Sequence, residues 1–227
     1  MKLINLIFPK KCAFCGEFTG GDVFCSVCAA KYEQMKLVPC KRCGEAHSLC
    51  RCRAEKLWGQ RSAGARHLFA YDGEMAKSII YKLKRKNLSS LQAFLGGELA
   101  ELIRQELRRG EKYIITYAPR AKKSVREYGF DQALLLAEAA AKILNFPVED
   151  VFERERGADT QQKTLGREER EQNVRSAFRL CGGAEIEGKT LIIIDDVTTT
   201  GSTAARLCEL ALEAGAAGIL FISAAKT

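Results

Sequence analysis

The chain has 227 residues, of which 47% are hydrophobic and 28% charged, a composition that excludes a disordered or fibrous protein. The length suggests one main domain with a small appendage, and no apolar run is long enough to span a bilayer, so we expect no membrane insertion. The net charge of +8 is uneven: residues 1–110 carry 20 Lys and Arg against 10 Asp and Glu, whereas residues 111–227 carry 16 against 18. This asymmetry suggests a polyanionic partner for the basic half.

The chain begins with a short amphipathic stretch, residues 1–8, which Pro9, Lys10 and Lys11 interrupt. A secretory signal needs a longer apolar stretch and a small-residue cleavage site, so we do not interpret this segment as an export signal. The sequence therefore predicts a cytoplasmic protein, in a reducing compartment where stable disulfides are not expected.

Eight of the ten cysteines lie within the first 52 residues, as four close pairs. The eight are Cys12, Cys15, Cys25, Cys28, Cys40, Cys43, Cys50 and Cys52. A C-x-x-C turn directs two thiolates at a shared ion, and two such turns complete a tetrahedral Zn2+ site with four thiolate ligands. The pattern favours zinc over the alternatives of free buried thiols or disulfides.

The spacing leaves the pairing open. Sequential pairs would give two sites, whereas a cross-braced arrangement or a single ion is also compatible with the spacing. The last pair is a tighter C-x-C turn, and His47 is available to replace a weak ligand. The role is structural, because a segment this small needs metal to fold. We expect a zinc-binding domain at residues 1–58 and a second domain at 59–227.

The region after the cysteines predicts a connector and two helices. Residues 53–70 are interpreted as a connector, and residues 77–86 as a basic amphipathic helix whose apolar side carries Met75, Ile79 and Leu83. Lys84, Arg85 and Lys86 of this helix are candidate contacts to pyrophosphate or nucleic acid, with a solvated helix face as the alternative. Residues 90–108 predict a second helix, weakened internally by Gly96 and Gly97.

From residue 112 the pattern alternates between strands and helices. Strands are predicted at residues 113–118, 148–152, 191–194 and 219–222, and helices at 130–144, 164–173 and 203–213. This alternation predicts an α/β fold with a parallel sheet flanked by helices, in which loops at the carboxyl ends of the strands form the site.

The strongest local signal is a buried strand that ends in Asp195 and Asp196 and is followed by a hydroxyl-rich loop and a helix. The amino end of a helix suits a phosphate, and Gly201 allows close approach of backbone to an anion. The two carboxylates would repel that phosphate, so we expect them to bind sugar hydroxyls or a hydrated Mg2+. The alternative is a strand followed by an ordinary helix capped by Thr or Ser.

Residues 192–203 resemble the 5-phosphoribosyl-1-pyrophosphate (PRPP) motif of type I phosphoribosyltransferases. With the cysteine-rich start, the whole chain resembles the ComF family, in which a double zinc ribbon precedes a phosphoribosyltransferase-like domain. Further matches are Tyr71-Asp72-Gly73, Arg126-x-x-Gly129-Phe130-Asp131-Gln132, and Thr160-x-Gln162-x-x-Leu165 with Arg170, Asn173 and Phe178. The chain departs from the family at Thr198, often aliphatic, at Asp131, usually Asn, and in its C-x-C pair.

The resemblance implies specific roles for these residues. Asp195 and Asp196 would hold the ribose hydroxyls of Mg2+-bound PRPP, and a real transferase would use them as its catalytic pair. The loop that would wrap the ligand comprises Val197, Thr198, Thr199, Thr200, Gly201, Ser202 and Thr203. Pro119 and Arg120 would lie at the pyrophosphate. Lys122, Lys123 and Arg126 are nearby candidate contacts to pyrophosphate or nucleic acid, with a solvated loop as the alternative.

The resemblance to the ComF family implies a PRPP-binding protein that handles incoming single-stranded DNA in natural transformation. Two alternatives stay open. One is an active phosphoribosyltransferase acting on an unknown base or amine, for which the sequence gives no identifiable acceptor site. The other is an interaction protein whose zinc ribbons dock a DNA-uptake helicase.

Overall fold

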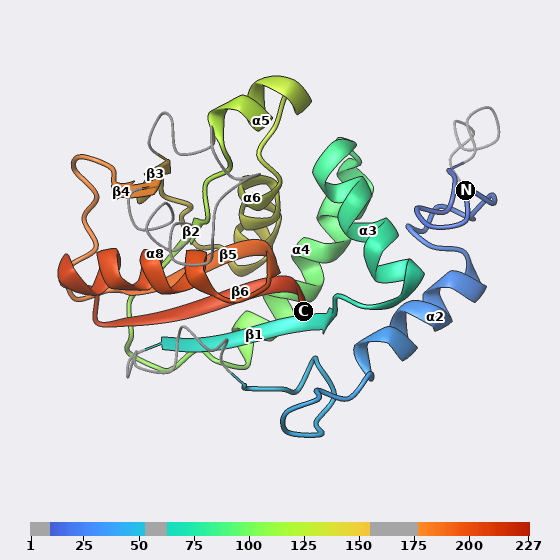
Figure 1. Ribbon diagram of the computed structural model, residues 1–227, viewed down its shortest axis with the longest axis horizontal. Helices are drawn as coiled ribbons and strands as arrows, with labels where there is room; N and C mark the ends of the chain where they lie inside the picture. The colour runs from blue at the N-terminus through green and yellow to red at the C-terminus, as the bar shows by residue number, and fades with distance from the viewer. Residues whose placement is uncertain (1–9, 53–62, 155–176) are drawn as a thin grey trace, which may run out of the picture.

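The computed structural model describes residues 10–52, 63–154 and 177–227 (Figure 1). The amphipathic stretch at residues 1–8, the polar helix predicted at 164–173 and the domain boundary expected at residues 58/59 lie outside the described residues. So do the family matches at Thr160, Gln162, Leu165, Arg170 and Asn173.

A four-stranded parallel sheet forms the centre of the molecule. Its strands are β1 (Ala63–Ala70), β2 (Tyr113–Tyr117), β5 (Thr190–Thr198) and β6 (Gly218–Lys226), in the spatial order β1-β6-β5-β2. Every neighbouring pair is parallel, as the sequence predicts. The carboxyl ends of all four strands therefore meet at one edge, where a ligand site is expected.

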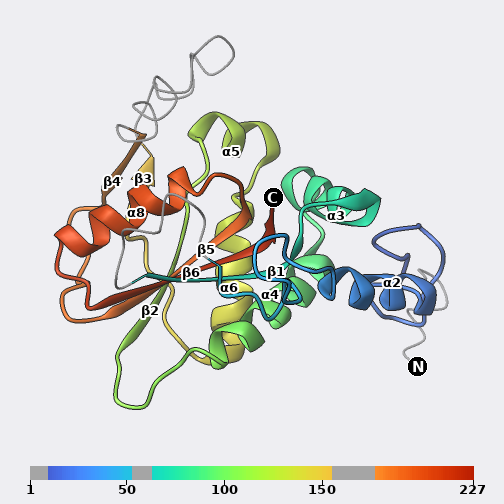
Figure 2. The ribbon, with the colours of Figure 1, turned by 60° about the horizontal axis from the view of Figure 1, so that its bottom comes forward.

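Helices cover both faces of this sheet (Figure 2). They are α3 (Gly73–Arg85), α4 (Ser89–Arg104), α6 (Gln132–Leu144) and α8 (Ser202–Glu213), whereas the short helix α5 (Lys122–Tyr128) buries no residue and lies above the sheet in Figure 1. Alternation along β5 explains the two cores: Ile192 and Ile194 pack with α3, α4 and α6, whereas Leu191 and Ile193 pack with α8. Both faces of β5 are buried, so its sequence is a continuous apolar run.

The cysteine-rich segment packs directly on the main domain. Its helix α2 (Ser26–Lys36) buries Tyr32, whose ring lies 6.1 Å from that of Phe69 on β1 and 5.1 Å from that of Phe94 on α4, measured between centroids. Aromatic rings at such distances stabilise an interface beyond the area they bury. The charge boundary near residue 110 is therefore no structural boundary, because β1, α3 and α4 from the basic half belong to the central core.

Four sequence predictions are wrong or incomplete. Residues 63–70 are not a connector but the edge strand β1, which lacks β-branched residues and buries Arg66 and His67. These polar groups are paired: Arg66 donates to Gln105 and Glu106, and His67 lies 2.7 Å from the Ser223 hydroxyl. A polar side chain can be buried when it has hydrogen-bond partners, so this strand lacks the apolar sequence by which a buried strand is usually predicted.

Two further predictions, the strand at 148–152 and the loop after β2, also differ from the structure. Val148 forms only an isolated bridge with Ile115, and the strand nearby is β3 (Phe152–Arg154), antiparallel to β4 (Phe178–Leu180). Residues 122–128, interpreted as a loop, form the short helix α5.

Gly96 is a close-packing position rather than an internal weakness of α4. A Cβ at residue 96 would lie 3.0 Å from the backbone carbon of Ala139 on α6 and would clash with the Ala139 side chain. At Gly97 the nearest atom, Ile143 Cδ1, lies at an ordinary 3.7 Å.

We predict that Gly96→Ala destabilises the protein by about 2 kcal/mol, since overpacking of a helix contact exceeds the gain in helix propensity. The matched variant Gly97→Ala should be neutral or stabilising by about 0.5–1 kcal/mol. Urea unfolding of both variants measures the difference. Equal stabilities of the two variants would contradict the close α4–α6 contact.

Candidate functional site

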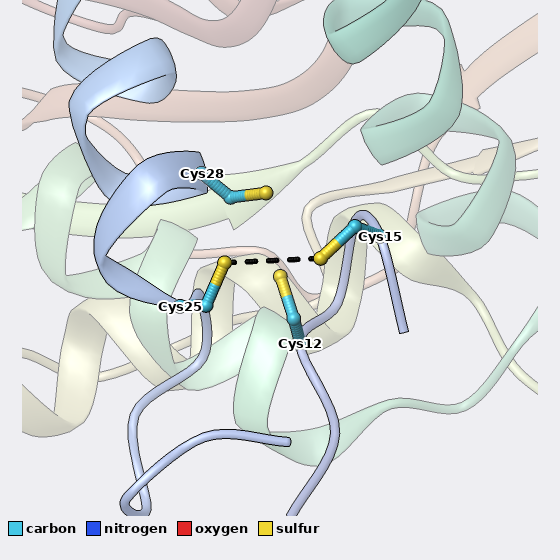
Figure 3. Close-up of side chains that lie close together, drawn as sticks. All are labelled: Cys12, Cys15, Cys25 and Cys28. Atoms are coloured by element: carbon cyan, nitrogen blue, oxygen red, sulfur yellow. Dashed lines mark hydrogen bonds between the residues drawn. The ribbon is translucent and has the colours of Figure 1, made fainter. Parts of the chain in front are cut away.

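The eight cysteines of the N-terminal segment form two separate clusters. Cys12, Cys15, Cys25 and Cys28 form one, and Cys40, Cys43, Cys50 and Cys52 the other; within each, all four sulfur atoms lie within 4.8 Å of one another. Figure 3 shows the four side chains of the first cluster pointing toward a common centre. The sequential pairing is thus the observed one, and His47 belongs to neither cluster.

The geometry fits zinc and not disulfides. Cys15 and Cys25 Sγ are 3.7 Å apart, and Cys43 and Cys50 Sγ are 3.6 Å apart. Zn–S bonds of about 2.3 Å in a tetrahedron place sulfurs about 3.8 Å apart. A disulfide needs about 2.05 Å. The two clusters therefore indicate two structural zinc sites.

The thiols of each cluster differ in acidity. Burial opposes ionisation of Cys12 and Cys40, but backbone N–H groups around each sulfur lower the pKa of both to about 6. Burial and neighbouring thiols raise the pKa of Cys28 and Cys50 to about 12. Four thiolates therefore cannot coexist without a cation, and Zn2+ supplies the charge that ionises all four.

We predict two zinc ions per chain by metal analysis of the purified protein, and one in Cys15→Ser, because three thiolates bind Zn2+ far more weakly. Cys181→Ser is the matched control, since Cys181 lies outside both clusters. Unchanged zinc content in Cys15→Ser, or loss of zinc in Cys181→Ser, would contradict this assignment.

At the carboxyl edge of the sheet, Asp196 is a buried carboxylate, only 5% exposed. Its Oδ2 accepts a hydrogen bond from Gln132 Nε2 of α6 at 2.9 Å and lies 3.3 Å from Lys84 Nζ of α3. A buried charge is tolerated when it is paired in this way. The structure therefore joins Lys84, expected to contact an anionic ligand, to the acid pair itself.

Asp195 lies beside Asp196 but has a different environment. Burial, followed by repulsion from Asp196, raises its pKa well above the ordinary range, and the opposing attraction of Lys84 is smaller. Its Oδ1 accepts a hydrogen bond from the Asp196 backbone N–H at 2.8 Å. A cation such as Mg2+ bound at the acid pair would favour the ionised form of this carboxyl.

The loop after β5 has the features of a phosphate site. Thr199 and Thr200 are exposed, and Gly201 adopts φ +81° at the amino end of α8, a left-handed conformation that favours glycine. The hydroxyls of Thr200 and Ser202 lie 2.9 Å apart, and Thr203 follows in the first turn. The N–H groups of the first turn of α8 and these hydroxyls are suitable donors to a phosphate.

Val197 and Thr198, the first residues of this segment, are directed into the protein rather than toward solvent. Thr198 is buried, and its hydroxyl donates to Ser223 Oγ at 2.9 Å within the sheet. Val197 is half-buried and packs against the core. The part of this segment that could contact a phosphate through side chains is therefore residues 199–203.

Arg120, after β2, is held in place by two neighbours. Its backbone N–H donates to Asp131 Oδ2 at 2.7 Å, while its guanidinium donates to the Lys84 carbonyl oxygen at 3.0 Å. Asp131 Oδ1 accepts from the first N–H groups of α6, so it caps that helix as well. Pro119 precedes Arg120 and is half-buried.

The remaining basic candidates lie on the surface. Lys122, Lys123 and Arg126 are exposed on α5, and Arg85 and Lys86 are exposed at the carboxyl end of α3. Sequence reasoning missed the pairing of Lys84 with Asp196 and the role of Gln132 in holding Asp196. Gln132 lies within a family motif, but nothing in its local pattern predicts a partner 64 residues away.

Comparison with known proteins places both parts of the chain. Residues 3–61 match the family described as "Double zinc ribbon domain", and residues 131–225 match "Phosphoribosyl transferase domain". The chain combines a double zinc ribbon with a phosphoribosyltransferase domain. The second match contains Asp131, Gln132, the acid pair and the loop at 199–203, whereas Lys84 and Arg120 precede it.

Two named relatives extend the resemblance. "Competence protein ComFC" of Streptococcus pneumoniae (strain ATCC BAA-255 / R6) is 27% identical over 199 residues, which cover 85% of this chain and 82% of that protein. "DNA utilization protein YhgH" of Escherichia coli (strain K12) is 34% identical over 91 residues, 40% of this chain and 39% of its own length. The resemblance to the ComF family is thereby confirmed.

Among solved structures, the chain resembles a glutamine PRPP amidotransferase from B. subtilis, with 21% identity, a TM-score of 0.42, and coverage of 63% of this chain and 30% of that one. In the described part of the chain, no helix is both long and apolar enough to cross a membrane.

We predict that Asp195→Asn raises the melting temperature of the ligand-free protein by about 2–4 °C, corresponding to about 1 kcal/mol, because it removes repulsion from Asp196 while keeping an acceptor for the Asp196 N–H. The same variant should lose Mg2+-dependent PRPP binding in calorimetry. A lowered melting temperature with unchanged PRPP binding would contradict both roles assigned to Asp195.

Proposed function

We propose that this protein binds Mg2+-PRPP at the acid pair and handles incoming single-stranded DNA during natural transformation. The observation that carries the proposal is the alignment with "Competence protein ComFC", which runs through the zinc ribbon and the transferase domain alike. The second relative, which matches only part of this chain, also refers to DNA in its name, "DNA utilization protein YhgH".

The site chemistry supports PRPP as ligand. Asp195 and Asp196 would bind Mg2+ and the ribose hydroxyls, the loop at 199–203 the 5-phosphate, and Arg120 the pyrophosphate. Mg2+, when bound, would neutralise the carboxylates and the pyrophosphate. Mg2+ bound there would compete with the Lys84 ammonium for the Asp196 carboxylate.

The surface charge supports DNA as partner. Lys77, Lys86, Lys122, Lys123 and Arg126 are exposed on α3 and α5 or in the residue after α3. Cations that neutralise phosphates release counterions, so binding weakens with salt. The reduced cysteine clusters, whose sulfurs are too far apart for disulfides, support a reducing, cytoplasmic location.

We predict that labelled oligothymidylate binds in a polarisation assay with log Kd rising by about 3 per tenfold increase in salt, as about four phosphate contacts require. The double variant Lys122→Gln/Lys123→Gln should lower that slope, whereas Lys142→Gln, an exposed lysine on α6, should not. No binding at low salt would refute the DNA-handling function, and equal slopes in both variants would refute the role of α5.

A second candidate function is docking of a protein partner such as a DNA-uptake helicase. The specific observation is that, among described residues, the zinc-ribbon segment carries five exposed large apolar side chains: Phe18, Val27, Leu37, Val38 and Leu49. Exposed apolar side chains of this size would suit a surface that docks a protein partner. Loss of helicase pull-down in Leu37→Ser/Leu49→Ser, with zinc retained, would support docking.

The transferase activity is the remaining alternative, favoured by the acid pair and its raised Asp195 pKa. Pyrophosphate release from Mg2+-PRPP, measured against a panel of bases and amines, decides it. Binding of PRPP without release would identify the ligand as a regulator.

A further inference from the structure

Helix α3 presents one exposed stripe of Lys77, Tyr81 and Arg85, spaced four residues apart on one face. Tyr81 is 56% exposed, whereas Met75 and Ile79, on the opposite face of the helix, are buried. An exposed aromatic side chain between two cations is an unusual use of a helix surface, because burial of the ring elsewhere would be favourable.

The remaining lysines of the helix middle are engaged elsewhere. Lys82 donates to the backbone oxygens of Ala13 and Phe14 in the first zinc knuckle, at 3.0 Å for Phe14, and Lys84 pairs with Asp196. Lys77 and Arg85 are the exposed cations of α3 that contact neither the zinc knuckle nor the acid pair.

The stripe continues into a second element through alternating rings and guanidinium groups. Arg85 Cζ lies 5.4 Å from the centre of the Tyr81 ring and 5.3 Å from that of Tyr128, the last residue of α5. Arg120 Cζ lies 4.6 Å from the Tyr128 ring. These distances are those of cation–π contacts. We call the four residues the Arg–Tyr ladder; it joins α3 to α5, which lie next to each other in Figures 1 and 2.

The ladder lies in strongly positive surroundings. Lys77 and Lys86 flank it along α3, and Lys122, Lys123 and Arg126 are exposed on α5. The acidic residues of these two helices are Glu74 and Glu127, so cations predominate. Positive charge interleaved with aromatic rings is the pattern by which proteins bind single-stranded nucleic acid.

We propose that the outer face of Tyr81 is a stacking site for a base of single-stranded DNA, and that the cations around the Arg–Tyr ladder hold the adjacent phosphates. Arg85 covers one face of the ring, and a base on the other face would extend the alternating series. Arg85 also contacts the Tyr128 ring, which supports its guanidinium beside Tyr81. This inference rests on the proposed function, since it names the surface that DNA uses.

Single strands fit this surface better than a duplex. A base must be unstacked to offer its face to a tyrosine ring, and duplex bases are not. Stacking tolerates any base, which suits a protein that handles DNA of arbitrary sequence.

The test compares Tyr81→Leu with the matched variant Tyr81→Phe in the full-length protein with zinc bound. Polarisation titrations use oligothymidylate and an abasic strand of the same length, which has the same phosphates but no bases. We expect Tyr81→Leu to lose about tenfold in affinity for oligothymidylate and nothing for the abasic strand, whereas Tyr81→Phe binds both as the wild type does. Thermal unfolding confirms that both variants are folded.

A second variant tests the ladder behind the ring. Tyr128→Leu removes the support of Arg85 and should weaken oligothymidylate binding several-fold, and Tyr128→Phe should not.

The failures are distinguishable. Wild-type protein that binds oligothymidylate while Tyr81→Leu binds it equally well would overturn the stacking site and leave the proposed function standing. Wild-type protein that binds neither strand would refute both. An equal loss on oligothymidylate and on the abasic strand in Tyr81→Leu would overturn the stacking on a base, because the abasic strand offers phosphates alone.

Discussion

The buried carboxylate of Asp196 fixes the relative positions of three parts of the chain that are distant in sequence. Lys84 reaches it from α3 at 3.3 Å and Gln132 from α6 at 2.9 Å, while Asp195 adjoins it on β5. Removing a partner from a buried charge is costly, so α3 must lie where its lysine meets that carboxylate. The candidate ligand site and the packing of α3 on the sheet thus depend on the same ion pair.

Helix α3 also contacts the core, the first zinc knuckle and the Arg–Tyr ladder. Its apolar face enters the core, and Lys82 binds the backbone of the first zinc knuckle, so the first cysteine cluster is attached to the helix whose Lys84 pairs with Asp196. Arg85, the neighbour of Lys84, begins the Arg–Tyr ladder, and Arg120 of that ladder donates to the Lys84 carbonyl oxygen. The acid pair and the surface proposed for DNA therefore share two neighbours, Lys84 and Arg120.

The sequence predicts those features that local pattern determines. The cysteine pairs, the parallel sheet, and the strand that ends in Asp195 and Asp196 all follow from spacing and periodicity. Strand β1 does not, because Arg66 and His67 are buried through partners from other elements. Nor does the pairing of Lys84 with Asp196, which a pattern of charges on a helix cannot distinguish from a solvated face. In the sequence Gly96 indicates a weak point of its helix, because the residue that it contacts, Ala139, lies on another helix.

The measurement that tests this account most directly is the affinity for oligothymidylate with and without saturating Mg2+-PRPP. Because the ligand would occupy the acid pair and bring its pyrophosphate to Arg120, we predict that it weakens DNA binding of the wild type about fivefold or more. Asp195→Asn, expected not to bind PRPP, should show no change, which excludes simple competition between polyanions. DNA affinity that is unchanged or increased by Mg2+-PRPP in the wild type would contradict the account.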